Sequence, residues 1–289
     1  MNDSSSTRRR LIQGLSLGLA LASIDKVSRA QERRVRRIFI TGSTDGLGRA
    51  AAQALIANGH QVVLHARSQE RVEALADLAP RAAGIVIGDL ASAVQTRDLA
   101  KQVNELGRMD AVIHNAGIYR EPNRGTTPEG HAKVLAVNVL APYLLTALID
   151  RPDRLIYLSS SMHHGGEGSL DDIDWSTRPW DTHRAYAESK LYVTTLAFAI
   201  ARRWPKVLSN AVDPGWVPTK MGGAGAPDDL QQGHQTQTWL ATSDDAAAKT
   251  SGGLWFHHLR QKPAAQSLDT RFQDELLAKL AELTEVKLP

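Results

Sequence analysis

The chain has 289 residues and no cysteine, and its 34 lysines and arginines exceed its 31 aspartates and glutamates by three. This length suits one large α/β domain or two small ones. Without cysteine, there is no disulfide framework, no cysteine-ligated metal site and no thiol nucleophile. Residues 1–30 carry five basic and two acidic side chains, so residues 31–289 carry 29 of each. A nucleic-acid partner is therefore not expected, because it would need basic residues gathered on the folded body.

The first thirty residues have the order of an export signal. Three arginines at 8–10 precede residues 11–24, an uncharged and mostly apolar run that is shorter than the roughly 20 residues of a membrane span. Small residues then suit cleavage after Ala30. Residues 7–13 resemble a twin-arginine motif, whose route exports folded proteins. We expect residues 1–30 to be this signal and the mature chain to be periplasmic or otherwise exported. An uncleaved membrane anchor and a plain basic tail on a cytoplasmic protein are the alternatives.

From residue 36 onward, short apolar runs alternate with longer segments of helical periodicity. The runs lack strict alternation, as expected for strands buried on both faces of a parallel sheet. Strands are expected at residues 37–40, 61–66, 83–88, 111–114, 154–158 and 207–212, with a last strand at 254–256. Helices are expected at residues 49–58, 69–78, 94–106, 128–149, 185–204 and 271–284. This order predicts a doubly wound, Rossmann-like α/β fold, in which residues 31–289 form one domain with a parallel sheet between two helical layers.

A glycine loop directly follows the first predicted strand. Its glycines permit a tight turn and leave the backbone N–H groups of the next helix free for an anion. The spacing Thr-Gly-x-x-x-Gly-x-Gly resembles that of the short-chain dehydrogenase/reductase family, and later motifs extend the resemblance from about residue 37 to residue 256. The resemblance implies a nicotinamide cofactor whose phosphates are held by Gly42, Ser43, Thr44, Gly46, Leu47 and Gly48.

The tip of the second predicted strand bears on which cofactor is used. Residues 64–68 read LHARS and offer no carboxylate to a ribose 2′-hydroxyl. Arg67 can pair with a 2′-phosphate, so we expect NADP rather than NAD. Asp45 argues the other way, since relatives that use NADP sometimes have a basic residue there. By resemblance, further cofactor contacts come from Asp89, Leu90, Asn115, Ala116 and Gly117, whereas His114 is interpreted as a structural residue at a strand end.

Tyr186 and Lys190 lie one turn apart on one face of a predicted helix. A phenol titrates at about 10, and a neighbouring ammonium together with a cationic nicotinamide ring favours the phenolate. Tyr186 would then act as acid in reduction and as base in oxidation. Three serines end the strand at 154–158, and the family resemblance selects Ser160 as the residue that polarises the substrate oxygen, with Ser159 as its rival.

The same resemblance assigns the remaining site residues. Asn138 would hold a water that links Lys190 to solvent. The nicotinamide end of the cofactor would contact Tyr186, Lys190, Pro214, Gly215, Val217 and Thr219. Two irregular stretches, residues 163–183 and 216–234, are too long for ordinary connections and are interpreted as substrate loops. The first adds residues to the sequence between Ser160 and Tyr186. In this respect the chain resembles the branch of the family that contains retinol dehydrogenases and WW-domain oxidoreductases.

The expected function is NADP-dependent hydride transfer to or from a small-to-medium, partly apolar ketone, aldehyde or alcohol. A non-catalytic NADP sensor or scaffold on the same fold is one alternative, and a double-bond reductase, epimerase or dehydratase is another. No metal site is expected, because adjacent histidines such as those at 163–164 and 257–258 rarely bind one ion. Family analogy suggests a homodimer or homotetramer through the helices at 128–149 and 185–204, unless the insertions block it.

Overall fold

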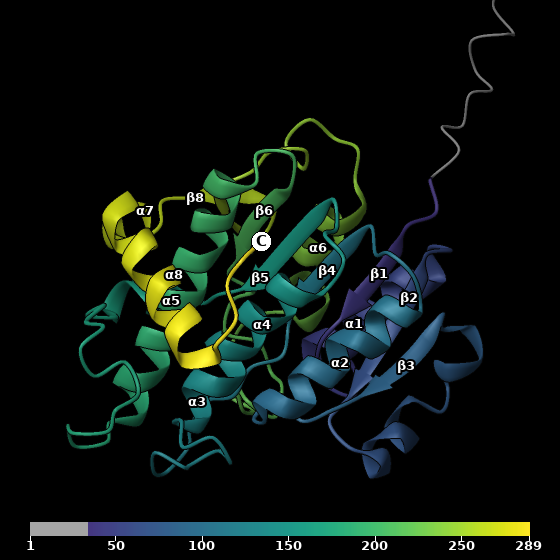
Figure 1. The fold of residues 1–289 in the computed structure, drawn as a ribbon. Coiled ribbons are helices and arrows are strands. Elements are labelled where there is room, and N and C mark those ends of the chain that lie inside the picture. Colours follow the sequence, from purple (N-terminus) through teal and green to yellow (C-terminus); the bar gives the residue numbers. More distant parts are fainter. Residues whose placement is uncertain (1–33) are drawn as a thin grey trace, which may run out of the picture. The chain divides into compact units, whose positions relative to one another are not determined.

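The computed structural model describes residues 34–289, and the predicted export signal lies outside them. Residues Arg36–Pro289 form one compact unit around a sheet with the strand order β3-β2-β1-β4-β5-β6-β7-β8 (Figure 1). Neighbouring strands are parallel, except for β8, which is antiparallel to β7. The strands are β1 (Arg37–Ile40), β2 (Gln61–Ala66), β3 (Gly84–Ile87), β4 (Ala111–His114), β5 (Arg154–Leu158), β6 (Leu208–Val212), β7 (Gly253–Phe256) and β8 (Leu259–Gln261).

Helices cover both faces of the sheet and give the expected three layers (Figure 1). The α-helices are α1 (Gly46–Ala57), α2 (Ala93–Glu105), α3 (Lys133–Leu135), α4 (Ala141–Leu148), α5 (Thr182–Arg203), α6 (Leu230–Thr242), α7 (Ala265–Leu268) and α8 (Thr270–Thr284). The shorter turns are the 3₁₀ helices η1 (Gln69–Leu75), η2 (Ala79–Arg81) and η4 (Ser161–Gly165) and the π-helical turn η3 (Ala136–Leu140). The predicted fold class is confirmed.

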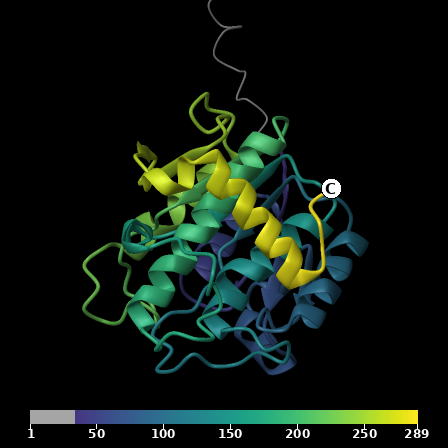
Figure 2. The ribbon, with the colours of Figure 1, turned by 60° about the vertical axis from the view of Figure 1, so that its left-hand side comes forward.

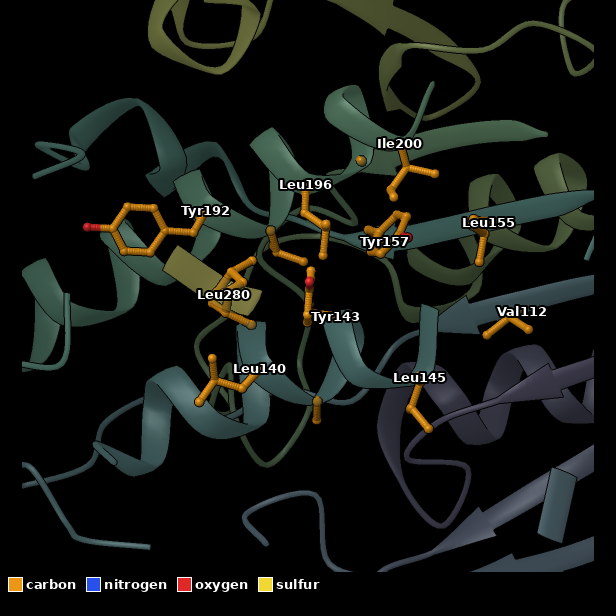
Figure 3. Packing of buried hydrophobic residues seen from close by; sticks show 14 of the residues in the cluster. Val112, Leu140, Tyr143, Leu145, Leu155, Tyr157, Tyr192, Leu196, Ile200 and Leu280 are labelled. Carbon is orange, nitrogen blue, oxygen red and sulfur yellow. The ribbon is translucent and has the colours of Figure 1, made fainter. Parts of the chain in front are cut away.

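The central strands are buried on both faces, which explains why their sequences do not alternate. In β1, Phe39 packs into the core that includes residues of α2, α4, α5 and α8. Its neighbours Ile38 and Ile40 pack into the opposite core, with residues of α1 and α6. Figure 3 shows the first core, where Tyr143 of α4 and Leu196 of α5 pack with Tyr157 of β5. Two apolar cores thus fix the sheet from both sides.

The segment predicted as an α-helix at residues 69–78 instead forms the 3₁₀ helix η1. The apolar residues Val72, Leu75 and Leu78 face one core and recur at every third position. This spacing matches the three residues per turn of a 3₁₀ helix. Pro80 follows and has no N–H with which to continue an α-helix.

The helix predicted at residues 128–149 begins only at Lys133 and is not uniform. Gly130 has a φ of +91°, which no α-helix contains, so the helix starts beyond it. The π-helical turn η3 then separates α3 from α4. Pro142 cannot donate an α-helical hydrogen bond to the carbonyl of Asn138, four residues earlier. The irregularity therefore falls at a residue that the sequence analysis assigned to the site.

Two further differences lie near the carboxyl end of the chain. The strand predicted as the last, at residues 254–256, is β7, but the chain turns back and adds β8. The turn contains His257 and His258 at φ values of 48° and 64°, a geometry usually formed by Asn and Gly, so its residues carry no turn signal. Helix α6 begins at Leu230, where Asp229 accepts a hydrogen bond from the N–H of Gln231, so the last part of the predicted loop 216–234 is helical.

The insertion at residues 163–183 packs against α5 through a buried ion pair. Glu188 of α5 is 1% exposed and accepts hydrogen bonds from both terminal nitrogens of Arg178, at 2.8 and 2.5 Å, and from Trp175 Nε1 at 3.1 Å. The Arg178 guanidinium also lies 3.6 Å from the centroid of the Trp175 ring. These contacts fix the first turns of α5, which carry Tyr186.

Helix α8 lies along α5 (Figure 2), where Phe272 contacts the ring of Tyr192. Every residue of α5 from Ala185 to Ile200 is buried within the chain. The carboxyl-terminal segment also accepts hydrogen bonds from Tyr143 and Trp204. Residues 185–200 therefore offer no exposed surface for the subunit contact expected at this helix. Across residues 34–289, no helix reaches the combination of length and hydropathy that crossing a bilayer demands.

Removal of the cation from the Arg178–Glu188 pair tests the insertion's anchoring. We expect Arg178→Met to lower the free energy of unfolding by about 3 kcal/mol, because the Glu188 carboxylate stays buried without its partner. Adding Glu188→Gln should recover part of the loss, since no buried charge remains. Urea denaturation measures both effects. The control is Arg271→Met, which breaks an exposed pair with Glu275 and should leave the midpoint unchanged. Equal urea midpoints for Arg178→Met and Arg271→Met would show that the Arg178–Glu188 pair does not anchor the insertion.

Candidate active site

A cavity of about 540 Å³ opens at the carboxyl edge of the sheet. It collects the glycine loop after β1, the tip of β2, the ends of β3 and β4, two side chains of α5 and the segment after β6. The sequence-predicted residues that line it are Gly42, Thr44, Gly46, Leu47, Arg67, Asp89, Leu90, Asn115, Ala116, Gly117, Tyr186, Lys190, Pro214 and Thr219. Most of the predicted set is therefore brought together in one place.

The other predicted residues are not part of the cavity lining. Two of them lie in the glycine loop and support the shape of that loop. Ser43 is fully buried, and its hydroxyl donates to the carbonyl of Ile40 at 2.7 Å. A Cβ on Gly48 would lie 2.3 Å from the Gly42 carbonyl oxygen and 2.4 Å from Asn115 Nδ2. Gly48 thus lets α1 approach the loop closely. Gly215, Val217, Asn138 and Ser160 are likewise not part of the lining.

His65 lines the cavity and was not predicted as a site residue. Its Nδ1 accepts a hydrogen bond from the N–H of Gly42 at 2.9 Å, and its Nε2 lies 2.8 Å from the carbonyl oxygen of Gly88. These contacts require Nδ1 unprotonated and Nε2 protonated. Burial lowers the pKa of His65, which keeps the ring neutral as this arrangement requires. The side chain therefore joins the glycine loop to the end of β3. Its position at the end of β2 was the signal available in the sequence.

Arg67 and a second arginine, Arg71, lie at one end of the cavity. Arg71 is positioned by η1 and donates to Thr44 Oγ1 at 3.4 Å. Asp45, the residue that argued against NADP, forms a 2.5 Å ion pair with Lys220 from the segment after β6. This pair lowers the pKa of Asp45 and neutralises its charge, so the two arginines dominate the charge at this end. Neither Arg71 nor Lys220 was predicted from the sequence.

Tyr186, Ser160 and Lys190 meet at the other end of the site. The Tyr186 hydroxyl and the Ser160 side chain are hydrogen-bonded. Lys190 Nζ lies 5.4 Å from the centroid of the Tyr186 ring and donates to the carbonyl of Leu158 at 2.8 Å. Lys190 is 4% exposed and Tyr186 is 7% exposed. Burial lowers the pKa of Lys190 to about 8, while the charge of Asp213 acts to raise it.

The pKa of Tyr186 is shifted in the direction opposite to the sequence expectation. Burial raises it above its ordinary value, with a further rise from the negative charge of Asp213, and the hydrogen bond with Ser160 opposes both. Desolvation disfavours a phenolate just as it disfavours any buried charge. Tyr186 is therefore a phenol at neutral pH, the form that can donate a proton.

The serines at the end of β5 have different partners. Ser159 Oγ lies 2.6 Å from Thr194 Oγ1 of α5, and Ser159 also lines the cavity. The carbonyl of Ser160 accepts hydrogen bonds from the backbone N–H of His163 and from its ring Nδ1. His163 Nε2 in turn accepts from the N–H of Ala264. The insertion and the segment before α7 thus hold Ser160 at Tyr186, while Ser159 belongs to the packing of α5.

Asn138 is 2% exposed, and its amide is occupied by protein groups. Its Oδ1 accepts from the N–H of Ile118, and its Nδ2 donates to the carbonyl of Ile118 and to Ser189 Oγ. A Cβ added to Gly117 would lie 3.4 Å from both Asn138 Oδ1 and Lys190 Nζ. The side chain therefore anchors the segment after β4 beside Lys190, and the expected bridging water would need another atom of Asn138.

Aromatic and apolar residues surround Tyr186. The ring of Tyr119 lies 4.4 Å from that of Tyr186, measured between centroids. Trp175, Trp180 and Met162 belong to the same small apolar cluster. The insertion thus contributes to the wall beside the Tyr186 hydroxyl and gives that end of the site an apolar character.

Comparison with known proteins shows the family that this chain resembles. A family model described as short chain dehydrogenase matches residues 36–229. The short-chain dehydrogenase chry4 of Gibberella zeae is 42% identical over 258 residues, which cover 88% of this chain and 98% of that protein. Human retinol dehydrogenase 13 is 30% identical over 287 residues, covering 88% and 86%.

Solved structures share the fold. A structure of an uncharacterised protein from Mycobacterium paratuberculosis superposes with a TM-score of 0.74 at 25% identity, covering 88% of this chain and 95% of the other. A gluconate 5-dehydrogenase from Burkholderia cenocepacia, solved with NADP and tartrate, superposes with a TM-score of 0.60 at 20% identity, covering 78% and 94%. At that identity the second likeness concerns the fold alone.

Proposed function

Because the chain belongs to the short-chain dehydrogenase family and is an NAD(P)-dependent dehydrogenase or reductase acting on CH–OH and C=O groups, we propose that it uses NADP and that Tyr186 transfers the proton. The observation that carries the proposal is the hydrogen-bonded Ser160–Tyr186 pair beside Lys190, at the same cavity as the glycine loop and Arg67. Fold alone would not carry it, since function lies in the site.

The cavity residues fit a dinucleotide with a 2′-phosphate. The glycine loop opens α1, whose first N–H groups and positive end favour a pyrophosphate. Arg67 and Arg71 supply cations at one end. Lys220 pairs with Asp45 and offsets the negative charge that would otherwise repel a phosphate. Asn115, Ala116, Gly117, Pro214 and Thr219 would line the path between the two ends. When bound, the cofactor supplies or accepts a hydride at its nicotinamide ring.

The protein's residues would manage the proton and the substrate oxygen. In reduction, Tyr186 in its phenol form donates a proton to the oxygen that becomes the alcohol. Ser160 donates a hydrogen bond to the same oxygen and polarises the carbonyl. The ammonium of Lys190 stabilises the phenolate left behind, because opposite charges attract strongly in a buried site. Asn138 would act by holding the segment after β4 against Lys190 rather than by touching substrate.

The substrate is proposed to be a small-to-medium, partly apolar ketone, aldehyde or alcohol. The aromatic residues beside Tyr186 and the apolar Met221 in the cavity lining favour such a compound. Residues 163–183 would form part of its binding wall, and the segment 216–229 with the start of α6 would cover it.

Replacement of Tyr186 by phenylalanine tests the proton donor. We expect Tyr186→Phe to lower kcat for carbonyl reduction by at least about 100-fold, because the ring remains but no proton can be given. NADPH affinity, measured by fluorescence titration, should stay unchanged. Tyr143→Phe is the matched control, since that hydroxyl only donates to the carbonyl of Val286 in the core. Full turnover by Tyr186→Phe would refute the assignment. If the wild type turns over no compound of a broad carbonyl and alcohol panel, the proposed oxidoreductase activity itself fails.

Removal of the Arg67 guanidinium tests the choice of cofactor. We expect Arg67→Ala to raise KM for NADPH by about tenfold or more, the order for one charge-assisted contact with phosphate, and to leave KM for NADH nearly unchanged. Steady-state kinetics with both cofactors give the ratio. Arg81→Ala, an exposed arginine outside the cavity lining, should change neither value. A wild-type enzyme that prefers NADH would count against NADP.

Residues 1–30 are proposed to be a twin-arginine signal, with residues 31–289 as the enzyme. Export in the folded state would let the protein bind its cofactor first. The expected result of sequencing the native protein is a new amino terminus at Gln31 in an exported fraction. Substituting both Arg8 and Arg9 by lysine should keep the protein in the cytoplasm. A soluble cytoplasmic pool that retains Met1 would exclude this route.

A further inference from the structure

Asp213 follows β6 directly and lies where three strands end. Its backbone N–H donates to the carbonyl of Trp255 in β7 at 2.8 Å. The carbonyl of the preceding Val212 accepts from the N–H of Ser159 at 2.7 Å. The position of Asp213 is therefore set by the ends of β5 and β7 and does not depend on a loose loop.

The carboxylate of Asp213 joins the two segments that hold the reacting groups. Its Oδ1 accepts a hydrogen bond from the N–H of Gly215 at 3.0 Å. The same carboxylate accepts from the N–H of Ser161, the residue after Ser160. One side chain thus connects the serine segment after β5 with the Pro214–Gly215 turn after β6.

Asp213 is also the acid whose charge acts on the two buried groups of α5. Its negative charge favours the ammonium of Lys190 and disfavours the phenolate of Tyr186. Among the other charged and titratable groups, Tyr119 faces Tyr186 from the segment after β4, and Asp228 faces Asp213 from the segment after β6. Asp213 itself is not part of the cavity lining.

We propose that Asp213 is a positioning residue of the reaction, whose carboxylate braces the serine segment after β5 against the Pro214–Gly215 turn and places a negative charge near Lys190 and Tyr186. The phenol is the form that donates a proton in reduction. The charge therefore helps to keep Tyr186 in the form that carbonyl reduction requires. This inference depends on the proposed function, because it assigns Tyr186 the role of acid.

Asp213→Asn separates the effect of the negative charge from that of the hydrogen bonds with the N–H groups of Gly215 and Ser161. Asparagine keeps the size and an oxygen that accepts from the same N–H groups, but it carries no charge. Loss of a nearby anion lowers the pKa of both coupled groups, whichever of them titrates first. We expect the alkaline limb of the pH profile for carbonyl reduction to move down by about one pH unit, the order for the loss of one nearby charge. Asp228→Asn removes a carboxylate from the same region and should leave the limb in place.

A second readout does not need turnover. The protein has five tyrosines, and ¹³C labelling at tyrosine Cζ followed by nuclear magnetic resonance reports the ionisation of each. Tyr186→Phe identifies the Tyr186 resonance. In Asp213→Asn this resonance should shift at a lower pH than in the wild type. Asp213→Glu, which keeps the charge, should titrate like the wild type.

The outcomes distinguish the two proposals. One outcome is that Asp213→Asn loses activity equally at every pH while the alkaline limb and the Tyr186 titration stay where they are in the wild type. This result would show that Asp213 only holds the two segments together, and it would overturn the inference. A shifted Tyr186 titration in a protein whose wild type reduces no carbonyl would uphold the electrostatic link and defeat the proposed function. If a melting curve shows that Asp213→Asn does not fold, Asp213→Ser tests the same loss of charge with a smaller hydrogen-bond acceptor.

Discussion

Burial of α5 on every side is the constraint on which the site depends. The helix is enclosed by the sheet, by the insertion at residues 163–183 and by α8, so residues 185–200 have no face in solvent. Tyr186 and Lys190 therefore sit in a medium that disfavours both a phenolate and an ammonium. A buried lysine at this position requires nearby acceptors, and the carbonyl of Leu158 and the charge of Asp213 provide them. Enclosure of the helix thus keeps Tyr186 a phenol, whereas these acceptors favour the ammonium of Lys190.

The enclosing segments also define what the enzyme can bind. Glu188, buried on α5 two residues after Tyr186, holds Arg178 and Trp175 of the insertion, and the insertion in turn packs aromatic side chains next to Tyr186. His163 connects Ser160 to the segment before α7, so the carboxyl-terminal part of the chain contributes to the position of a proposed catalytic side chain. The same arrangement covers the helix through which an oligomer was expected to form. The packing of these segments around α5 thus bears on the stability of the fold, on the proposed substrate wall and on the surface left for another subunit.

The sequence alone was sufficient for the fold and for most of the cavity lining. A parallel sheet buried on both faces leaves runs of Val, Ile and Leu, and the glycine loop and the Tyr-Lys pair sit at fixed offsets from those runs. The predictions from the sequence that were wrong concern segments in which local backbone geometry overrode the helical hydrophobic pattern. In η1 the apolar residues repeat every third position, and in the helix after β4 Gly130 and Pro142 displace and interrupt the regular turns. The histidine turn before β8 has no residue that announces it.

What the sequence determined by itself is the order of the elements and the identity of the residues at the carboxyl ends of the strands, because both depend on contacts between near neighbours in the chain and on hydrophobic period. Tertiary structure decided which of those residues face one another. Ser160 rather than Ser159 hydrogen-bonds with Tyr186, Lys220 pairs with Asp45 from more than 170 positions away, and His65 joins the glycine loop to β3. Asp213 accepts a hydrogen bond from the N–H of Ser161, and its charge acts on Lys190. Each of these depends on side-chain directions and on the desolvation of charges, which exist only once distant segments have packed.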